Sequence, residues 1–426
     1  MFFFSDDYSA EKRTLSSFPE IIDENKKLNV NFTTELDDYL SEHFSFRTDV
    51  VSVFSSLKYS VFNESLEEQV VAGKDGWLYF SKTLDDYTGK NLMSDYEIDS
   101  LVKTLDIIDE YIESKGAEFV FVVAPNKNSV YPQYMPYYFT KTQSNSNLDI
   151  LNEKNKDKNY YLNIKSGLVD SEELLYHKTD THWNNLGAIY CYNAIMKKFN
   201  KDYIDYLESG YSVKCNWQSD LNTMLFPKKE LYDNQVEFNK KTDFEYISKF
   251  RSVEDLNIET TTKNGTGKLL MYRDSFTNAL LPFLSSNFEY SKFTRVLPYR
   301  LNELETTDYD YVVIEIVERN LTEILKSAPI LQSPYRQIDN SCSIINSAEI
   351  FFRENADLTH IYGSFKCSDI PEEIIVSVDL ADETKSFVAF PIFEEKLLGE
   401  YDEEKKYFSL YIPETELNKN VKIYVK

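Results

Sequence analysis

Three short, mostly apolar runs restrict the fold of this chain more than any other feature of its sequence. The runs are Glu118–Ala124, Lys268–Tyr272 and Tyr309–Val317. They are rich in Val, Ile, Leu and Phe, which is typical of strands buried on both faces of a parallel sheet. Helical periodicity lies around them, at residues 101–112, 184–199 and 277–284. Strands that alternate with helices in this way predict an α/β domain built on a parallel sheet.

The sequence between these runs predicts further elements of the same domain. Residues 32–62 carry apolar side chains at a period of about 3.6, which predicts a helical N-terminal segment. In Val71–Phe80, the dipeptide Asp75-Gly76 stands between apolar flanks, which is a strong signal for a β-hairpin. The polar stretch 201–267 is predicted to be an insertion of mixed structure between a helix and a strand.

The pattern changes after about residue 334 and predicts a second domain. Short β-like runs follow one another there without helical periodicity, at 374–378, 387–393, 407–412 and 421–425. This pattern is typical of a small antiparallel β-sandwich. We therefore predict a catalytic domain over residues 1–335 and a β-rich accessory domain over 336–426. Tyr407 and Tyr411 are its candidate glycan-binding aromatics, although alternation favours core packing for at least one of them.

The charge of the chain and its few Cys and His residues exclude several classes of function. Lys and Arg total 46 against 71 Asp and Glu, which gives a net charge of −25 at pH 7. Such an acidic chain repels phosphate backbones, so nucleic acid is not an expected partner. The four Cys form no Cys-x-x-Cys pair and there are only four His, so we expect neither a metal site nor a cofactor. No apolar run reaches the roughly 18 residues of a membrane span.

Ser275 stands at the carboxyl end of the second predicted strand and just before a predicted helix. Open α/β sheets bind ligands at this edge, where a helix N-terminus directs backbone N–H groups at negative charge. A serine there can be a nucleophile whose own N–H forms part of an oxyanion hole. The alternative is that Ser275 or Asp274 only caps the helix.

Asp180 and His182 lie two residues apart, in Asp180-Thr-His-Trp-Asn-Asn-Leu-Gly187, at the start of another predicted helix. Serine catalysis needs a His that takes the hydroxyl proton while a carboxylate holds its other nitrogen. An Asp and a His at this spacing can make that contact within one turn. The alternative is an Asp that caps the helix beside an incidental His.

Polar residues at the ends of the other two strands are candidates for the same site. Asn320 and Arg319 follow the third strand and could donate a second hydrogen bond to an oxyanion. The alternative for them is a solvated loop, in which Arg319 pairs with Glu318 at little energetic value. Asn126 and Lys127 follow the first strand and are weaker candidates for the same rim.

These blocks together resemble the alginate O-acetyltransferase-like, or DHHW, family, whose members are circularly permuted SGNH hydrolases. The resemblance covers residues 11–325 and is most specific in Asp180-Thr-His-Trp183 and Arg273-Asp-Ser-Phe276. The other similar stretches are Arg13-Thr-Leu15, Phe44-Ser-Phe-Arg47, Gly73-Lys-Asp-Gly-Trp-Leu78, Pro125-Asn-Lys127 and Val312–Asn320. The chain departs from classical SGNH enzymes at Arg273, where they carry Gly, and at Glu318-Arg-Asn320.

The resemblance implies an SGNH hydrolase-like three-layer α/β/α fold and a Ser275–His182–Asp180 triad. Arg273 and Trp183, which flank these residues, are further candidates for oxyanion or substrate contacts. The resemblance also implies an extracytoplasmic protein that follows an N-terminal membrane helix. It further implies an integral-membrane O-acyltransferase that relays acetyl groups to this protein. We therefore expect a polysaccharide O-acetyltransferase with an acyl-serine intermediate. A carbohydrate acetylesterase with the same triad and a non-catalytic glycan-binding scaffold are the alternatives.

Overall fold

The computed structural model describes residues 17–20, 29, 31–32, 34–36, 39 and 65, and then residues 67–426 except for 228, 356, 368–369, 381–382, 394–401, 403 and 414–416. Most of the helical segment predicted over residues 32–62 lies outside the described residues. The similar stretches at residues 13–15 and 44–47 lie outside them as well.

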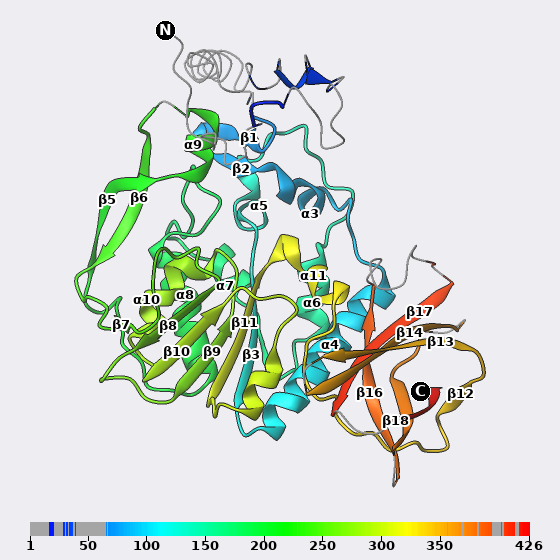
Figure 1. Cartoon of the computed structure of the whole chain (residues 1–426). Helices are drawn as coiled ribbons and strands as arrows, with labels where there is room; N and C mark the ends of the chain where they lie inside the picture. The colour runs from blue at the N-terminus through cyan, green and yellow to red at the C-terminus, as the bar shows by residue number, and fades with distance from the viewer. Residues whose placement is uncertain are drawn as a thin grey trace.

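A seven-stranded sheet forms the centre of the larger part of the molecule (Figure 1). Its order is β4 (Tyr161–Leu162), β3 (Glu118–Ala124), β11 (Tyr311–Val317), β9 (Lys268–Tyr272), β10 (Tyr290–Thr294), β8 (Asn257–Thr261) and β7 (Glu245–Tyr246). The first five strands are parallel to one another. At the edge, β8 pairs antiparallel with β10, and β7 pairs antiparallel with β8. The three predicted strands are therefore confirmed. The sheet is mixed because two strands of the insertion extend it.

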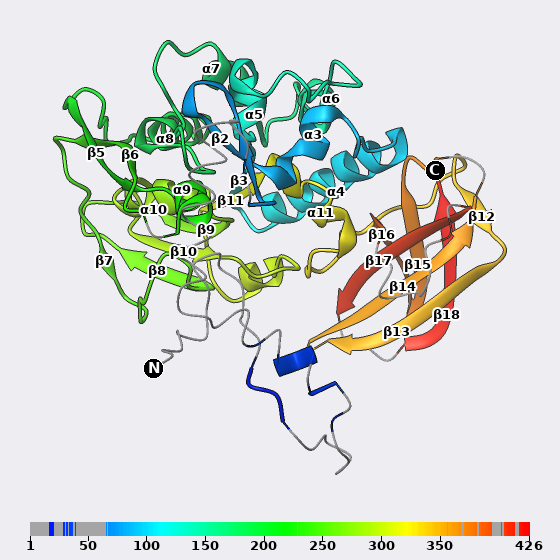
Figure 2. The same ribbon diagram turned by 90° about the horizontal axis from the view of Figure 1, so that it is seen from above.

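Helices cover both faces of this sheet and complete three layers (Figures 1 and 2). The helices are α4 (Asp95–Ser114), α6 (Asn147–Lys154) and α11 (Glu323–Lys326) on one face, and α8 (Asn185–Lys198) and α10 (Thr277–Ser285) on the other. Alternate residues of β3 point to opposite layers: Phe119 and Phe121 pack with α4, whereas Val120 and Val122 pack with α8. The predicted α/β/α fold is thus confirmed.

Shorter elements lie around the edge of the sheet that carries the site. They are α3 (Leu84–Thr88), α5 (Lys127–Val130), α7 (Lys165–Val169), β5 (Tyr211–Gln218), α9 (Asp220–Leu225) and β6 (Tyr232–Phe238). The predicted hairpin is also present, as β1 (Val70–Ala72) paired antiparallel with β2 (Leu78–Phe80). Asp75 and Gly76 adopt φ values of 54° and 76° in its turn, a conformation that Asp and Gly tolerate better than other residues.

The C-terminal strands form a separate seven-stranded antiparallel sheet. Its order is β12 (Ser343–Ile345), β18 (Leu417–Val425), β15 (Ile374–Leu380), β16 (Thr384–Ile392), β17 (Lys405–Pro413), β14 (Leu358–Lys366) and β13 (Ala348–Asn355). Among the described residues, none of these strands pairs with the central sheet. The predicted β-rich C-terminal region is therefore confirmed, whereas the exact domain boundary stays a prediction.

The C-terminal sheet packs against helix α4 through a shared apolar core. Phe390 on β16 is fully buried among the α4 side chains. Tyr407 and Tyr411, on β17, are only 5% and 6% exposed and belong to the same core. Their assignment as exposed glycan-binding aromatics is therefore wrong, because the face of the sheet that carries them is covered by the α/β domain.

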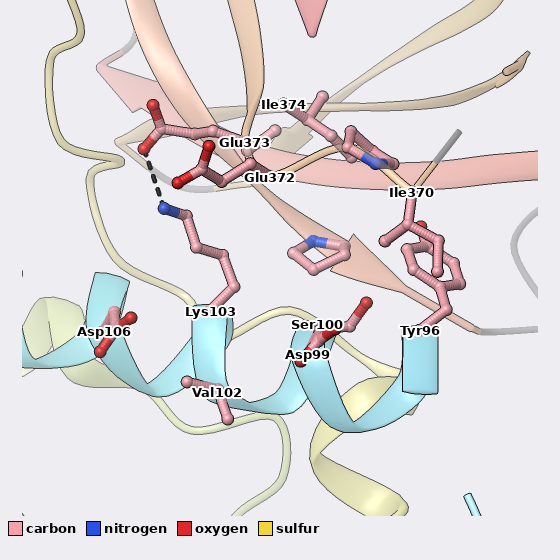
Figure 3. Close-up of a pocket in the computed structure, with 13 residues that line it drawn as sticks. Tyr96, Asp99, Ser100, Val102, Lys103, Asp106, Ile370, Glu372, Glu373 and Ile374 are labelled. Carbon is pink, nitrogen blue, oxygen red and sulfur yellow. Dashed lines mark ion pairs between the residues drawn. The ribbon is translucent and has the colours of Figure 1, made fainter. Parts of the chain in front are cut away.

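A cavity of about 460 Å³ remains at this junction, between α4 and the C-terminal strands (Figure 3). Lys103 on α4 crosses it to form a 3.1 Å ion pair with Glu373. All four cysteines are free. Within the part of the chain that the structure describes, every helix is too short or too polar to cross a bilayer.

Candidate active site

Ser275, His182 and Asp180 lie in one hydrogen-bonded chain at the carboxyl edge of the sheet. The Nε2 atom of His182 is 2.9 Å from the Oγ of Ser275, and its Nδ1 is 2.7 Å from the Oδ1 of Asp180. Ser275 follows β9, whereas the other two residues lie in the loop before α8. The fold thus brings together residues 93 positions apart in the geometry of a serine nucleophile, a base and an orienting carboxylate.

Neither Ser275 nor Asp180 is used as a helix cap. Helix α8 is capped by Asn184, whose side chain accepts hydrogen bonds from the N–H groups of Leu186 and Gly187. Helix α10 begins at Thr277 without a side-chain cap. The Ser275 hydroxyl and the Asp180 carboxylate are therefore both directed at His182 instead.

A glycine is required where helix α8 leaves this loop. A Cβ atom on Gly187 would lie 2.4 Å from the carbonyl oxygen of Leu175 and 2.7 Å from the Cβ of Trp183. Any larger residue would push the helix away from the strand-like segment before it. The Gly that ends the Asp-Thr-His-Trp block thus keeps the loop close to the sheet.

The insertion supplies the environment of the Asp180 carboxylate. Its Oδ2 accepts hydrogen bonds from the indole N–H of Trp217, at 3.0 Å, and from the backbone N–H of Asp220, at 2.9 Å. Asp180 is only 2% exposed. Burial alone would raise its pKa, but the hydrogen bond and charge of His182 and the Asp220 N–H outweigh it and hold the pKa well below the usual range. The carboxylate therefore stays ionised.

A second carboxylate, Asp220, lies beside His182. Its Oδ2 is 3.8 Å from the Nδ1 of His182. Burial lowers the pKa of His182, but the hydrogen bond and charge of Asp180, and then the charge of Asp220, outweigh burial and raise it. Burial, and then the nearby charge of Asp180, raise the pKa of Asp220 itself. The site therefore favours the imidazolium that forms when His182 takes a proton.

Strands β9 and β11 are tied together directly beneath Ser275. The carboxylate of Asp274 accepts hydrogen bonds from the N–H groups of Val317, at 2.7 Å, and Phe276, at 2.9 Å. Glu315 on β11 accepts from the Thr277 hydroxyl at 2.7 Å and from the Asp274 N–H at 3.2 Å. These contacts fix the backbone on both sides of the nucleophile.

Arg319 is the strand-end residue that best fits an anion-binding role. Its guanidinium lies over the rings of Phe276 and Phe80, at 5.8 and 5.6 Å from their centroids. Its Nη1 is buried and has no hydrogen-bond partner among the described residues. Its charge lowers the pKa of His182, after the larger effects of burial, Asp180 and Asp220. Asn320 is half-buried. Among the described residues, no hydrogen bond or ion pair joins it to the triad.

Asn126 and Lys127 are buried behind the triad rather than at its rim. The Asn126 N–H donates to Glu318 at 2.8 Å, and its side-chain amide donates to Asp86 at 2.9 Å. This arrangement supports the turn that carries Arg319. The Lys127 ammonium donates to three backbone carbonyls of the loop that precedes His182. Neither side chain is directed at Ser275.

Arg273 and Trp183 also position backbone segments. Arg273 donates to the carbonyls of Val253, at 2.8 Å, and Asp255, at 3.2 Å, and so holds the insertion against β9. Burial lowers its pKa to about 10. The Trp183 indole is 1% exposed and donates to the carbonyl of Phe276 at 2.9 Å. It therefore links the His182 loop to the residue after Ser275.

A cleft of about 620 Å³ opens beside the triad and includes Ser275 and His182 in its walls. Helix α10 and strand β6 form its sides, with Phe238 and Phe283 among its apolar residues and Asn185 among its polar ones. The junction cavity of Figure 3 contains none of the triad residues. The cleft that contains Ser275 is therefore the candidate substrate site.

The cluster of Asp180, His182 and Asp220 has side-chain atoms close enough to bind a metal ion. However, both nitrogens of His182 are already engaged, one with Asp180 and the other with Ser275. Both oxygens of Asp180 accept N–H hydrogen bonds as well. The donor atoms are therefore arranged for proton transfer, and this cluster does not fit a metal site.

Sequence reasoning missed Trp217 and Asp220, because the insertion was predicted only as a stretch of mixed structure. No local signal marks them: they lie 37 and 40 residues from Asp180 in the sequence. It also missed that the Asp274 carboxylate links β9 to β11, and predicted only a possible helix cap there. These contacts become visible only where β9, β11 and the insertion pack together.

Solved structures resemble the chain at low sequence identity. A DHHW family protein from Eubacterium siraeum is 18% identical, with a TM-score of 0.44, over 59% of this chain and 91% of that one. The O-acetyltransferase domain of Pseudomonas putida AlgJ is 15% identical, with a TM-score of 0.39, over 59% and 91%. Pseudomonas aeruginosa AlgX is 14% identical, with a TM-score of 0.37, over 84% and 93%. Values this low say nothing about activity.

A family model gives the clearer relationship. No curated protein matches the chain. Residues 70–222, however, match the model described as the SGNH hydrolase-like domain of acetyltransferase AlgX. The matched segment contains Asp180 and His182, and the fold places Ser275 against them. Over residues 70–222, this chain is therefore similar to the SGNH hydrolase-like domain of acetyltransferase AlgX.

Proposed function

We propose that this chain is a polysaccharide O-acetyltransferase that works through an acetyl ester on Ser275. The observation that carries the proposal is the continuous hydrogen-bonded chain from Ser275 through His182 to Asp180, at 2.9 and 2.7 Å. The family match supports acetyl as the transferred group. In this proposal His182 is the general base and acid, and Asp180 orients it and stabilises its charged form.

The first half-reaction forms the acetyl-enzyme. The Nε2 atom of His182 takes the hydroxyl proton of Ser275 while the Oγ bonds to the carbonyl carbon of the acetyl donor. The resulting oxyanion is stabilised by the N–H of Ser275 and by the guanidinium of Arg319. The bond to the leaving group then breaks, and His182 returns the proton to that group.

The second half-reaction transfers the acetyl group to a sugar. A sugar hydroxyl gives its proton to His182 while its oxygen attacks the acetyl carbon, and the released Ser275 oxygen then takes the proton back. Water can follow the same route, so the acceptor that is held in near-attack geometry decides the outcome. The cleft beside Ser275, with apolar surfaces and polar side chains, is the place that we assign to this sugar.

The partners and the location are part of the same proposal. On the family resemblance, we assign the protein to the extracytoplasmic side of a membrane, anchored by a helix. We also propose that an integral-membrane O-acyltransferase supplies the acetyl group. The polysaccharide is the acceptor, and nucleic acid is not a partner, because the net charge of −25 opposes it.

The decisive experiment is the intact mass of the protein after incubation with an activated acetyl ester. Wild type should gain one acetyl group, mapped to Ser275, and Ser275→Ala should gain none. Adding oligosaccharides should then remove the acetyl group from the enzyme and yield an acetylated sugar. Fast hydrolysis without any acetylated sugar would establish the esterase alternative. Equal inertness of wild type and Ser275→Ala would establish a non-catalytic glycan-binding scaffold.

A further inference from the structure

Lys127 is buried, and all three N–H groups of its ammonium donate hydrogen bonds to one short turn. The side chain is 3% exposed and stands at the start of α5, just after strand β3. Its ammonium donates to the carbonyl oxygens of His177, Lys178 and Asp180, at 3.2, 3.1 and 2.5 Å. An ammonium group has three N–H donors, so each of them has an acceptor in this turn.

The same turn carries the orienting carboxylate and the base of the triad. A β-bridge between Tyr176 and Trp183 closes the turn. The three carbonyls bound by Lys127 therefore lie inside the 177–182 turn, which also carries Asp180 and His182. No other described side chain donates to these three carbonyls. The backbone N–H of Leu78 also donates to the carbonyl oxygen of Lys178.

The charged and titratable groups around Lys127 come from several elements. The ammonium lies 5.7 Å from the ring centroid of Trp77 and 5.3 Å from that of Tyr79, on the hairpin. The carboxylates of Asp180, Asp220 and Asp233 stabilise its charge from a longer distance, and His177 lies in the same turn. Among the described residues, Lys127 forms no ion pair within 4.0 Å with any carboxylate. It therefore acts mainly on the backbone of the turn.

We propose that Lys127 is a positioning residue that holds Asp180 and His182 in register with Ser275 through the backbone of the 177–182 turn. This role rests on the proposed function, because it concerns the same triad. The contacts differ from those of a catalytic residue, since Lys127 touches neither Ser275 nor the side chain of His182. Its three hydrogen bonds act on the carbonyl groups of residues 177, 178 and 180.

The clamp needs the charged form of the side chain. A neutral amine has only two N–H donors and a lone pair, so one of the three carbonyls would face that lone pair. Burial lowers the pKa of Lys127 to about 8, and the nearby aspartates oppose this effect only in part. The three hydrogen bonds are therefore complete well below pH 8, and one of them is lost as the pH rises through about 8.

The test measures the rate at which a sulfonyl fluoride labels Ser275, as a function of pH. Labelling reports the reactivity of the serine and does not depend on an acetyl donor, so the proposed transferase function can fail while this inference still holds. Wild type should label faster as His182 loses its proton and then more slowly above about pH 8. Lys127→Met should label at least about tenfold more slowly at pH 7, because a shift of about 1 Å at a reacting group has effects of this size or larger. Its labelling should show no decrease above pH 8.

Two variants make the test decisive. Lys127→Arg keeps a permanent charge, so its labelling rate should stay within a few-fold of wild type and lose the decrease above pH 8. Lys292→Met is the control, because Lys292 is a half-buried lysine that forms an ion pair with Glu303, away from the triad. It should label like wild type.

If Lys127→Met fails to fold by near-ultraviolet circular dichroism, the comparison of wild type with Lys127→Arg decides. Labelling of Lys127→Met at the wild-type rate, or a decrease above pH 8 that persists in Lys127→Arg, would overturn the proposal.

Discussion

The indole N–H of Trp217 donates a 3.0 Å hydrogen bond to the Oδ2 of Asp180. The backbone N–H of Asp220 donates to the same oxygen, which leaves Oδ1 for the imidazole and the backbone N–H of His182. Trp217 also stacks on His177, at 4.8 Å between ring centroids and an interplanar angle of 5°. The insertion therefore determines the orientation of the carboxylate on which His182 depends.

Removing the indole N–H should slow acyl transfer while the fold is kept. Trp217→Phe preserves most of the stacking on His177 but loses the hydrogen bond to Asp180. A hydrogen bond to a charged group contributes about 1.5–3 kcal/mol, so kcat/KM should fall by about 10- to 100-fold. The measurement is ester turnover, with a urea titration to show that stability is little changed. Asn216→Ala, in the exposed neighbour, should behave like wild type. An unchanged kcat/KM in Trp217→Phe would show that Asp180 does not need the hydrogen bond from the Trp217 indole.

The acidic limb of the pH profile should respond to Asp220. His182 must be neutral to accept the serine proton, so activity rises as the pH increases through its raised pKa. Asp220 contributes to that raised value after Asp180. Asp220→Asn removes a negative charge 3.8 Å from the Nδ1 of His182, so the limb should move to lower pH. Profiles of kcat/KM from pH 5 to 8 check the direction of this shift. A shift to higher pH would contradict the assignment.

Replacing Arg319 should lower kcat much more than replacing Asn320. Arg319→Met keeps an unbranched side chain over Phe276 and Phe80 but removes the charge. Loss of one oxyanion donor lowers kcat by about 10²- to 10³-fold in enzymes of known mechanism, and we expect a decrease of this order. Asn320→Ala should change kcat by less than about threefold, because no hydrogen bond or ion pair of the described residues joins Asn320 to the triad. The reverse result would move the second oxyanion donor from Arg319 to Asn320.

The junction between the two sheets should contribute strongly to stability and little to chemistry. Phe390 is fully buried in the core that β16 shares with α4. Phe390→Ala should lower the free energy of unfolding by about 3–5 kcal/mol, because it leaves a cavity in that core. Phe351→Ala is the control, since this ring is 44% exposed on the edge strand β13, and should cost under about 0.5 kcal/mol. Urea titrations give both values. Ester turnover in buffer should be similar for the two variants, and a large loss in Phe390→Ala alone would couple the C-terminal sheet to the triad.

The fold class could be predicted because its signals are local. Strands β3, β9 and β11 are apolar on both faces, and this pattern occurs within a few residues of sequence. The short runs after residue 361 likewise became strands β15 to β18. Asp180 and His182 are two residues apart, so their contact needs only one turn, and the strand-end position of Ser275 indicated the edge where they meet.

The remaining parts of the site depend on which distant segments pack together. Nothing within the insertion indicates that Trp217 would reach Asp180, and nothing near residue 407 indicates that α4 would cover Tyr407 and Tyr411. The strand-end polar residues were all plausible donors in the sequence, because a side chain at a strand end can point into the site or behind it.

The sequence by itself thus predicted the sheet and its helices, and it indicated Ser275, His182 and Asp180 as candidate site residues. Tertiary structure decided the partners of these residues. It left Arg319 as the candidate donor with an unpaired nitrogen, directed Lys127 to the backbone and placed Trp217 on the carboxylate. The physical reason is that propensity and periodicity act over a few residues, whereas hydrogen bonds to a buried charge are chosen by whatever donors the packed chain brings within about 3 Å.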